Sequence, residues 1–284
     1  MNKRWFGILS PVVLWLSFFM LVPMLAVVVV SFLQRDTVGN LVWTFNLNNY
    51  SRFFDPLYLG IYWDTIWLSV LTTALCLLLS YPLAYYIATA GPKMQKWMLI
   101  GVTVPFWINF LIRTYAWVLI LRTQGLVNMG LENLGLISEP LQLLYTKGAV
   151  LLGMVYTFIP YMVLPIYVSL EQMDKRLLEA ASDLGASRWS SFWRITLPQT
   201  KSGIMTGGVL VFVTTTGMFV VTDILGGAKS QMLSNIIQNQ FLSARDWPFG
   251  AALSVIFMIS SLIIIGLFNR AMRSKYESAK EARA

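Results

Sequence analysis

The side chains that most often carry out chemistry in proteins are scarce in this chain. Histidine is absent, and Cys76 is the only cysteine among 284 residues. A serine or cysteine nucleophile would therefore lack a histidine base, intrachain disulfides are excluded, and a zinc site of the usual histidine and cysteine ligands is not expected. Cys76 lies in the apolar string TALCLLLSY, where cysteine acts as a small buried hydrophobic residue. These absences argue against an enzyme, including a membrane-bound one.

One short segment resembles part of a nucleotide-binding loop in sequence, namely Gly226-Gly227-Ala228-Lys229-Ser230. A P-loop requires G-x4-G-K-[ST], in which glycine amides and the lysine surround the phosphates. Here no glycine directly precedes the lysine, and the string falls between two apolar stretches on the side expected to lie outside the cell. We interpret it as a loop turn and expect this chain to bind no cofactor.

Asp223 is the only carboxylate inside a stretch apolar enough to cross a membrane. An acid at mid-helix costs about 2.5–3.5 kcal/mol on insertion scales, so such residues usually face a cavity or a partner. One interpretation is that Asp223 attracts the ammonium group of a cationic substrate near the outer gate. The others are a structural ion pair with Arg113, or a position nearer the outer surface. Arg113 would repel a polycation, which favours a structural role for it.

Aromatic rings could line the same path, because they hold alkylammonium groups by cation–π attraction of about 0.5–2 kcal/mol each. Asp64, at the outer end of the second apolar stretch, could belong to an entry vestibule. Packing between helices is the alternative role of each ring. The candidate rings are Trp107, Tyr115, Tyr156, Tyr161 and Phe219.

The composition indicates the elements that must position these residues. Hydrophobic residues make up 57% of the chain and charged residues 12%, against about 25% charged residues in soluble domains. A bilayer core needs about 20 apolar residues per helix. The sequence therefore predicts an all-α polytopic membrane protein with six transmembrane helices. We place them near 7–33, 62–90, 97–121, 148–170, 203–225 and 248–269.

The basic residues predict the orientation of these helices. The net charge of +8 comes from short basic blocks between apolar runs rather than from one patch, which argues against nucleic acid as a partner. Of the 21 lysines and arginines, fourteen lie on one side and six on the other, with Arg113 inside a span. The positive-inside rule then places both termini and the 171–202 loop in the cytoplasm. The first apolar run is too long for a signal peptide and is expected to remain as a helix.

The 171–202 loop contains DKRLLEAASDLGASRWSSFWRITLP, which predicts two short helices. Asp174 can cap the first helix, and Gly185 can end it in the left-handed conformation. Ser187 can cap the second helix, which is expected to stop before Pro198. The first helix carries an apolar face and the second an aromatic one; these faces are Leu177, Leu178, Ala181 and Leu184, and Trp189, Phe192 and Trp193.

Such a helix pair can lie on lipid headgroups or can contact another protein. The loop carries several carboxylates, which are unfavourable against an anionic leaflet and therefore favour a protein partner. The carboxylates are those of Glu171, Asp174, Glu179 and Asp183.

The loop also resembles a known family. Glu179-Ala180-Ala181, Gly185 and Ile195-x-Leu197-Pro198 match the EAA motif, EAA-x3-G-x9-I-x-LP, of binding-protein-dependent ABC importer permeases. The resemblance implies the type I ABC importer permease fold. It also implies that this loop inserts a helix into a separate ATPase subunit. The expected ATPase contacts, carried over by position, are Glu179, Ala180, Ala181, Asp183 and Gly185.

Further segments along the whole chain resemble the spermidine/putrescine importer permeases, and among them the B-type subunit. They include VPFWINFLIRTYAW (104–117), DILGGAKS (223–230) and RDWPFGAA (245–252). The family implies import of polyamines into a bacterium across its inner membrane. It also implies a second homologous permease, two copies of a cytoplasmic ATPase that holds ATP and Mg, and a periplasmic binding protein. The expected parts are an N-terminal helix with its outer loop (1–61), a five-helix permease core (62–270) and a cytoplasmic tail (271–284).

Two other transport functions stay open. The same machine could carry another solute, such as an amino acid, sulfate, ferric ion or thiamine. An ion-driven secondary transporter would instead show inverted repeats and several buried acids, and it would leave the EAA spacing unexplained.

Overall fold

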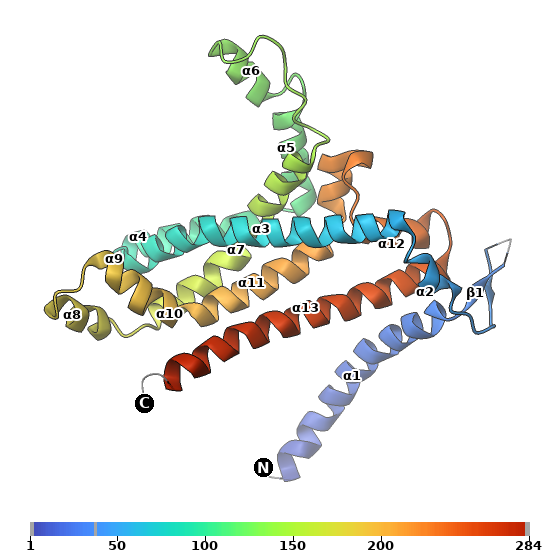
Figure 1. The fold of residues 1–284 in the computed structure, drawn as a ribbon, viewed down its shortest axis with the longest axis horizontal. Coiled ribbons are helices and arrows are strands. Elements are labelled where there is room, and N and C mark those ends of the chain that lie inside the picture. Colours follow the sequence, from blue (N-terminus) through green and yellow to red (C-terminus); the bar gives the residue numbers. More distant parts are fainter. Residues whose placement is uncertain (1–2, 37–38, 282–284) are drawn as a thin grey trace. The chain divides into compact units, whose positions relative to one another are not determined.

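The computed structural model describes residues 3–36 and 39–281, and it is mostly helical (Figure 1). The side chains of residues 3–10, 229, 269 and 271–281 are not described, and residues 282–284 of the expected tail lie outside the described part. A short antiparallel hairpin pairs β1 (Gln34–Arg35) with β2 (Leu41–Val42), with Gln34 opposite Val42. The predicted all-α fold class is confirmed. The chain forms two compact units: Met1–Ile61 with Asn235–Ile264, and Tyr62–Ser234 with Ile265–Ala284.

In the first unit, the end of α1 (Lys3–Ser31) is held by α2 (Asn48–Arg52). The last carbonyls of a helix have no partner within the helix and need one elsewhere. The buried Asn49 amide donates to the carbonyls of Ser31 and Leu33, at 3.1 and 2.9 Å. The hydroxyls of Tyr50 and Ser31 lie 2.7 Å apart. These bonds fix the direction in which the chain leaves α1.

The same unit contains the beginnings of α3 (Pro56–Thr89) and α13 (Trp247–Glu281), and most of α12 (Leu233–Leu242). The Arg52 guanidinium donates to Asp246 at 2.8 Å and lies 3.9 Å from the centre of the Phe249 ring. Asp246 also accepts a hydrogen bond from the Phe249 backbone at 3.3 Å, which caps the start of α13. This cluster joins α2 to α13.

The second unit is built around α7 (Lys147–Glu171). Its first helices are α3, α4 (Pro92–Trp107), α5 (Phe110–Leu121) and α6 (Leu126–Asn133). After α7 come α8 (Arg176–Asp183), α9 (Arg188–Ser191), the π-helix η1 (Phe192–Thr196), α10 (Leu197–Gln199) and α11 (Lys201–Thr216). The π-helix η2 (Thr222–Gly226) and the 3-10 turn η3 (Gly227–Lys229) follow, and the part of α13 from Ile265 onward belongs to the same unit.

A buried stripe at every fourth residue of α7 forms the core, which is the spacing of one helix face. The stripe is Met154, Phe158, Met162, Ile166 and Leu170. Small polar groups of α3 bond to α7: the Cys76 thiol lies 3.7 Å from the Val155 carbonyl, and the Ser80 hydroxyl lies 3.3 Å from the Ile159 carbonyl. Cys76 is fully buried, which confirms the role predicted for it.

Two glycines allow α11 to approach α7 closely. A Cβ on Gly203 would overlap the carbonyl oxygen of Pro165, and a Cβ on Gly207 would lie 2.7 Å from the Met162 sulfur. The Gly203-x-x-x-Gly207 spacing puts both on one helix face, as in many membrane helix pairs. The spacing is visible in the sequence, and in the structure it allows α11 to lie close against α7.

The prediction of six spanning helices is not confirmed. Among the described residues, four helices are long and apolar enough to cross a membrane: Pro11–Ser31, Pro56–Thr89, Lys147–Glu171 and Trp247–Phe268. A fifth span results if the bent pair Pro92–Trp107 and Phe110–Asn133 counts as one.

The stretch predicted as a helix over 97–121 is bent by 94° at its middle. Pro105 lies in the last turn of α4 and has no N–H to donate to the carbonyl four residues earlier, which weakens this turn. Asn109 then caps a new helix, because its side chain accepts from the Leu111 N–H at 2.9 Å. Hydrophobicity is continuous across this point, so it hides the break.

The stretch predicted over 203–225 is also interrupted. Its helix α11 has only 16 residues and ends before Gly217. The hydroxyls of Thr214 and Thr216 bond to carbonyls of the preceding turn, at 2.6 and 2.8 Å. Such bonds, followed by a glycine, weaken the end of a helix. The chain resumes as η2, which carries Asp223.

Candidate functional site

The 171–202 loop folds as a helical hairpin between α7 and α11 (Figure 1). Asp174 accepts a hydrogen bond from the Arg176 backbone at 3.0 Å at the start of α8. At its other end, Gly185 has φ 78°, its N–H donates to Ser182, and Ala186 donates to Ala181, each at 2.9 Å. This pair of bonds is a Schellman motif, which confirms the left-handed Gly185.

Most of the EAA-motif positions face outward from this hairpin. Glu179, Ala180, Asp183 and Gly185 are exposed, whereas Ala181 is buried. A Cβ on Gly185 would meet nothing within 4 Å, so the space beside it is open. Leu184, expected on the apolar face of α8, is 89% exposed. The outer surface of the hairpin therefore carries the carboxylates of Glu179 and Asp183 together with the apolar side chain of Leu184.

Aromatic packing fixes the second helix of the hairpin. Ser187 caps α9 as predicted, because its hydroxyl accepts from the Ser190 N–H at 3.2 Å. Phe192 packs edge-on against Tyr81 and Tyr85 of α3, with ring centres 5.6 and 6.2 Å apart. Trp189 stacks on Phe192 at 5.9 Å and stays 70% exposed. Phe192 therefore anchors the hairpin, and Trp189 extends its outer surface.

The prediction that this second helix stops before Pro198 is wrong. The backbone passes through the π-helix η1 into α10, where Pro198 occupies a first-turn position. Proline is tolerated there because the first turn of a helix does not use its N–H groups within the helix. The wider π turn makes this possible.

The aromatic side chains that we predicted to line the substrate path differ in their exposure to solvent. Trp107, at the end of α4, is 88% exposed, and Tyr115 on α5 is also exposed. On α7, Tyr156 is exposed at its rim and packs against Trp117 at 5.5 Å. Tyr161 instead packs against Phe106 and Phe158, at 4.7 and 5.8 Å. Helix packing is therefore the structural role of Tyr161.

Asp223 lies on η2 and is exposed. Phe219, partly buried, precedes it by one turn and accepts a hydrogen bond from the Asp223 backbone at 2.9 Å. Elements α5, α7 and η2 pack against one another, so Tyr115, Tyr156 and Asp223 lie on elements that are in mutual contact. Among the described side chains, ion pairs join Arg52 to Asp246 and Lys147 to Asp64, and Arg113 takes part in neither.

The glycines after Asp223 hold η2 against α7. Gly227 has φ 55° and ψ −150°, a conformation that is essentially restricted to glycine. A Cβ on Gly226 would lie 2.7 Å from a methyl group of Val150. The Tyr145 N–H donates to the Leu225 carbonyl at 2.9 Å. These two glycines of the P-loop-like string thus serve packing, and the Lys229 side chain lies outside the described part.

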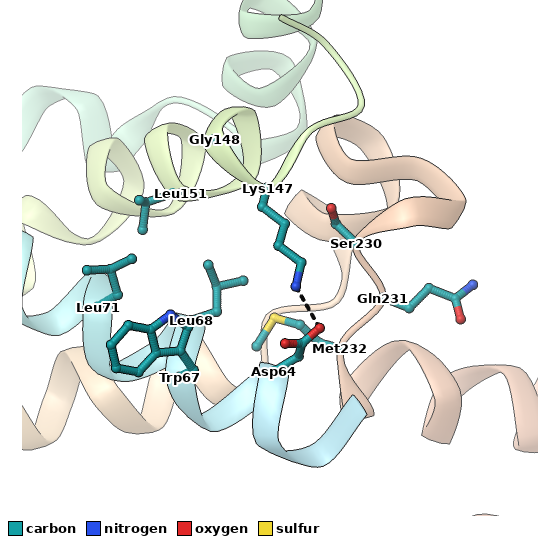
Figure 2. A pocket seen from close by; sticks show the side chains of 10 residues that line it. All are labelled: Asp64, Trp67, Leu68, Leu71, Lys147, Gly148, Leu151, Ser230, Gln231 and Met232. Carbon is teal, nitrogen blue, oxygen red and sulfur yellow. Dashed lines mark hydrogen bonds and ion pairs between the residues drawn. The ribbon is translucent and has the colours of Figure 1, made fainter. Parts of the chain in front are cut away.

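Asp64 lines a pocket of 180 Å³, and none of the other residues predicted for the substrate path line this pocket (Figure 2). The Lys147 ammonium donates to its carboxylate at 2.7 Å, with side chains that are 65% and 56% exposed. An exposed pair of this kind contributes about 0–1 kcal/mol to stability. Lys147 is the first residue of α7, where the helix dipole disfavours a cation by about 0.3–1 kcal/mol.

Lys147 is a site residue that the sequence does not reveal, because it lies 83 positions from Asp64. The one available signal is a lysine directly after the capping residue Thr146, whose side chain accepts from Ala149 at 3.1 Å. Among the described residues, no group of three or more His, Cys, Asp or Glu side chains is placed to hold a metal ion.

Comparisons with known proteins agree over nearly the whole chain. A family model described as binding-protein-dependent transport system inner membrane component matches residues 2–276. The spermidine/putrescine transport system permease protein PotB of Haemophilus influenzae is 41% identical over 257 residues, 90% of each protein. PotB of Escherichia coli K12 is 42% identical, covering 91% of this chain and 94% of its own. The inner membrane ABC transporter permease protein YdcU of E. coli K12 is 31% identical over 78% of this chain and 73% of its own.

Solved structures share the fold. A bacterial ABC transporter involved in alginate import matches with a TM-score of 0.80 and 19% identity, covering 95% of both chains. The MetNI methionine ABC transporter matches with a TM-score of 0.60 and 15% identity, covering 78% of this chain and 98% of its own. The predicted permease fold is therefore confirmed.

Proposed function

Because the chain belongs to the family of binding-protein-dependent transport system inner membrane components, we propose that it is the permease subunit of an ATP-driven polyamine importer. Members of this family are transport subunits rather than enzymes. The proposal that polyamines are the substrate rests on the 41–42% identity to spermidine/putrescine permeases over at least 90% of this chain. Spermidine and putrescine would pass from the periplasm to the cytoplasm.

The 171–202 hairpin is the proposed contact with the ATPase. Its carboxylates Glu179 and Asp183 face outward, and Gly185 leaves room for a partner to approach. The hairpin is anchored on α3 through Phe192 of η1. We propose two ATPase copies that hold ATP and Mg, a second homologous permease and a periplasmic binding protein. One structural relative was solved in complex with a periplasmic protein carrying alginate pentasaccharide.

We propose the orientation that the basic residues favour, with both termini and the hairpin in the cytoplasm. A loaded binding protein would then dock outside and release polyamine into a cavity between the two permeases. Closure of the ATPase dimer would move the hairpins and turn the cavity inward. On this chain, the proposed path includes Asp223, Phe219 and the exposed rings of Trp107, Tyr115 and Tyr156, whereas Tyr161 packs α7 against α4.

Asp223→Asn is expected to lower spermidine uptake about tenfold, a loss of about 1.4 kcal/mol. The substitution keeps the size of the side chain and removes the charge that attracts an ammonium group. The loss of uptake is measured from the initial rates at which membrane vesicles take up radiolabelled spermidine. Glu139→Gln, which neutralises another exposed carboxylate in the loop before α7, is the control. An unchanged rate in Asp223→Asn would remove this residue from the path.

The identity of the substrate is tested by competition between radiolabelled spermidine and unlabelled solutes. Vesicles that contain ATP and all partner subunits are given radiolabelled spermidine with an excess of putrescine, an amino acid, sulfate, ferric ion or thiamine. Putrescine and unlabelled spermidine are expected to compete, and the others are not. Absence of spermidine uptake, with ATP-dependent uptake of one of the other solutes when that solute is itself radiolabelled, would assign the importer to that solute.

A further inference from the structure

The pocket around Asp64 combines one carboxylate with apolar and aromatic walls. Asp64, Trp67, Leu68 and Leu71 follow the i, i+3, i+4, i+7 spacing and form one face of α3. The beginning of α7 forms a second wall of the pocket, and the segment from Ser230 to Met232 forms a third wall. Such a lining suits a cation carried on a methylene chain, since the chain contacts the apolar wall and the ammonium group contacts the carboxylate and the indole ring.

The Lys147 side chain lines this pocket and pairs with its carboxylate. It reaches from α7 toward Asp64, and its ammonium lies 2.7 Å from the carboxylate oxygen (Figure 2). A lysine side chain is four methylene groups with a terminal ammonium. It therefore has the same chemical form as the aminobutyl end of putrescine or spermidine. The structure thus shows Asp64 paired with an alkylammonium group that belongs to the chain itself.

Two features make this pair replaceable. Both side chains of the pair are more than half exposed, so water and dissolved cations reach them. Lys147 stands at the N-terminus of α7, where the dipole of the helix opposes its charge.

We propose that the pocket is a subsite for one primary ammonium end of a linear polyamine, and that Lys147 is a tethered occupant which the substrate displaces from Asp64. The inference rests on the proposed function. A volume of 180 Å³ is below the range of about 300–1,000 Å³ typical of whole-ligand pockets, so the pocket takes one arm of the molecule. Lys147 then lowers the affinity of the subsite, which prevents a polycation from remaining bound at the entrance.

Equilibrium binding of radiolabelled spermidine to the complete complex in nanodiscs, without the binding protein, tests this. Lys147→Met keeps the apolar stem and frees Asp64; it is expected to bind spermidine about five- to tenfold more tightly than the wild type. Asp64→Asn is expected to bind it about five- to tenfold more weakly. The double variant should match Asp64→Asn, because Lys147 acts only through Asp64. Arg122→Met, which removes another exposed cation of the same unit, is the charge-matched control.

The outcomes separate this inference from the proposed function. If wild-type vesicles transport spermidine but Lys147→Met and Lys147→Gln both bind it as the wild type does, the subsite is wrong and the importer stands. The same conclusion follows if both substitutions only lower the amount of folded complex, since the pair is then a structural clamp. If the wild type transports no spermidine with its partners present, the proposed function itself fails.

Discussion

Glu179→Lys is expected to abolish ATP-dependent spermidine uptake while leaving the protein folded in the membrane. Glu179 is exposed on α8, and lysine forms helices about as well as glutamate. Its place in the first turn of α8 favours an acid over a base by only about 0.3–1 kcal/mol. The substitution should therefore change the stability of the chain very little.

The large effect arises at the proposed contact with the ATPase. Disrupting a buried charged contact between proteins costs about 2–5 kcal/mol, which corresponds to at least about 30-fold in coupling. Uptake and ATP hydrolysis stimulated by the loaded binding protein should both fall by this factor. Glu139→Lys, the same reversal at an exposed position in the loop before α7, should leave both unchanged. Import that persists in Glu179→Lys would disprove the coupling role.

Gly203→Ala is expected to destabilise the permease by about 1–3 kcal/mol, the usual range for overpacking. The added methyl group would overlap the Pro165 carbonyl and lie 2.9 Å from the Ser169 Cβ. The Pro165 carbonyl is backbone of α7, which cannot rotate away, so α7 and α11 must separate. Because folded domains are stable by only about 5–15 kcal/mol, this loss is a large fraction of the total.

Gly208→Ala is the matched control for this effect. It lies on the same helix, but its Cβ would come no closer than 3.6 Å to the Phe268 ring, an ordinary contact. Alanine favours the helix over glycine by about 1 kcal/mol, so this variant should be neutral or more stable. The stability of both variants is measured as the melting temperature of the detergent-solubilised complex. Equal melting temperatures for the two variants would contradict the close packing of α7 and α11.

The hairpin was predictable from the sequence because its determinants are local. The Asp174 and Ser187 caps, the left-handed Gly185 and the outward-facing carboxylates depend on residues a few positions apart. The same holds for the Gly203 and Gly207 face, whose spacing is visible in one turn of a helix. The fold class follows from composition alone.

The helix breaks were not predictable from hydrophobicity. A hydrophobic average treats 97–121 as one span, whereas Pro105 and the Asn109 cap turn the chain by 94°. Likewise, η1 carries the helix past Pro198, because a π turn changes which N–H groups are needed. The Lys147–Asp64 pair depends on tertiary packing between α3 and α7, and no local sequence pattern predicts it.

Transport into proteoliposomes of known content shows whether ATP drives import through this permease. The vesicles contain this chain, its companion permease and the ATPase, with ATP enclosed and the loaded binding protein outside. Radiolabelled spermidine is expected to accumulate only when ATP is enclosed, and ionophores which collapse ion gradients are expected to leave the rate unchanged. Accumulation that needs an ion gradient and proceeds without ATP would contradict it and would favour a secondary transporter.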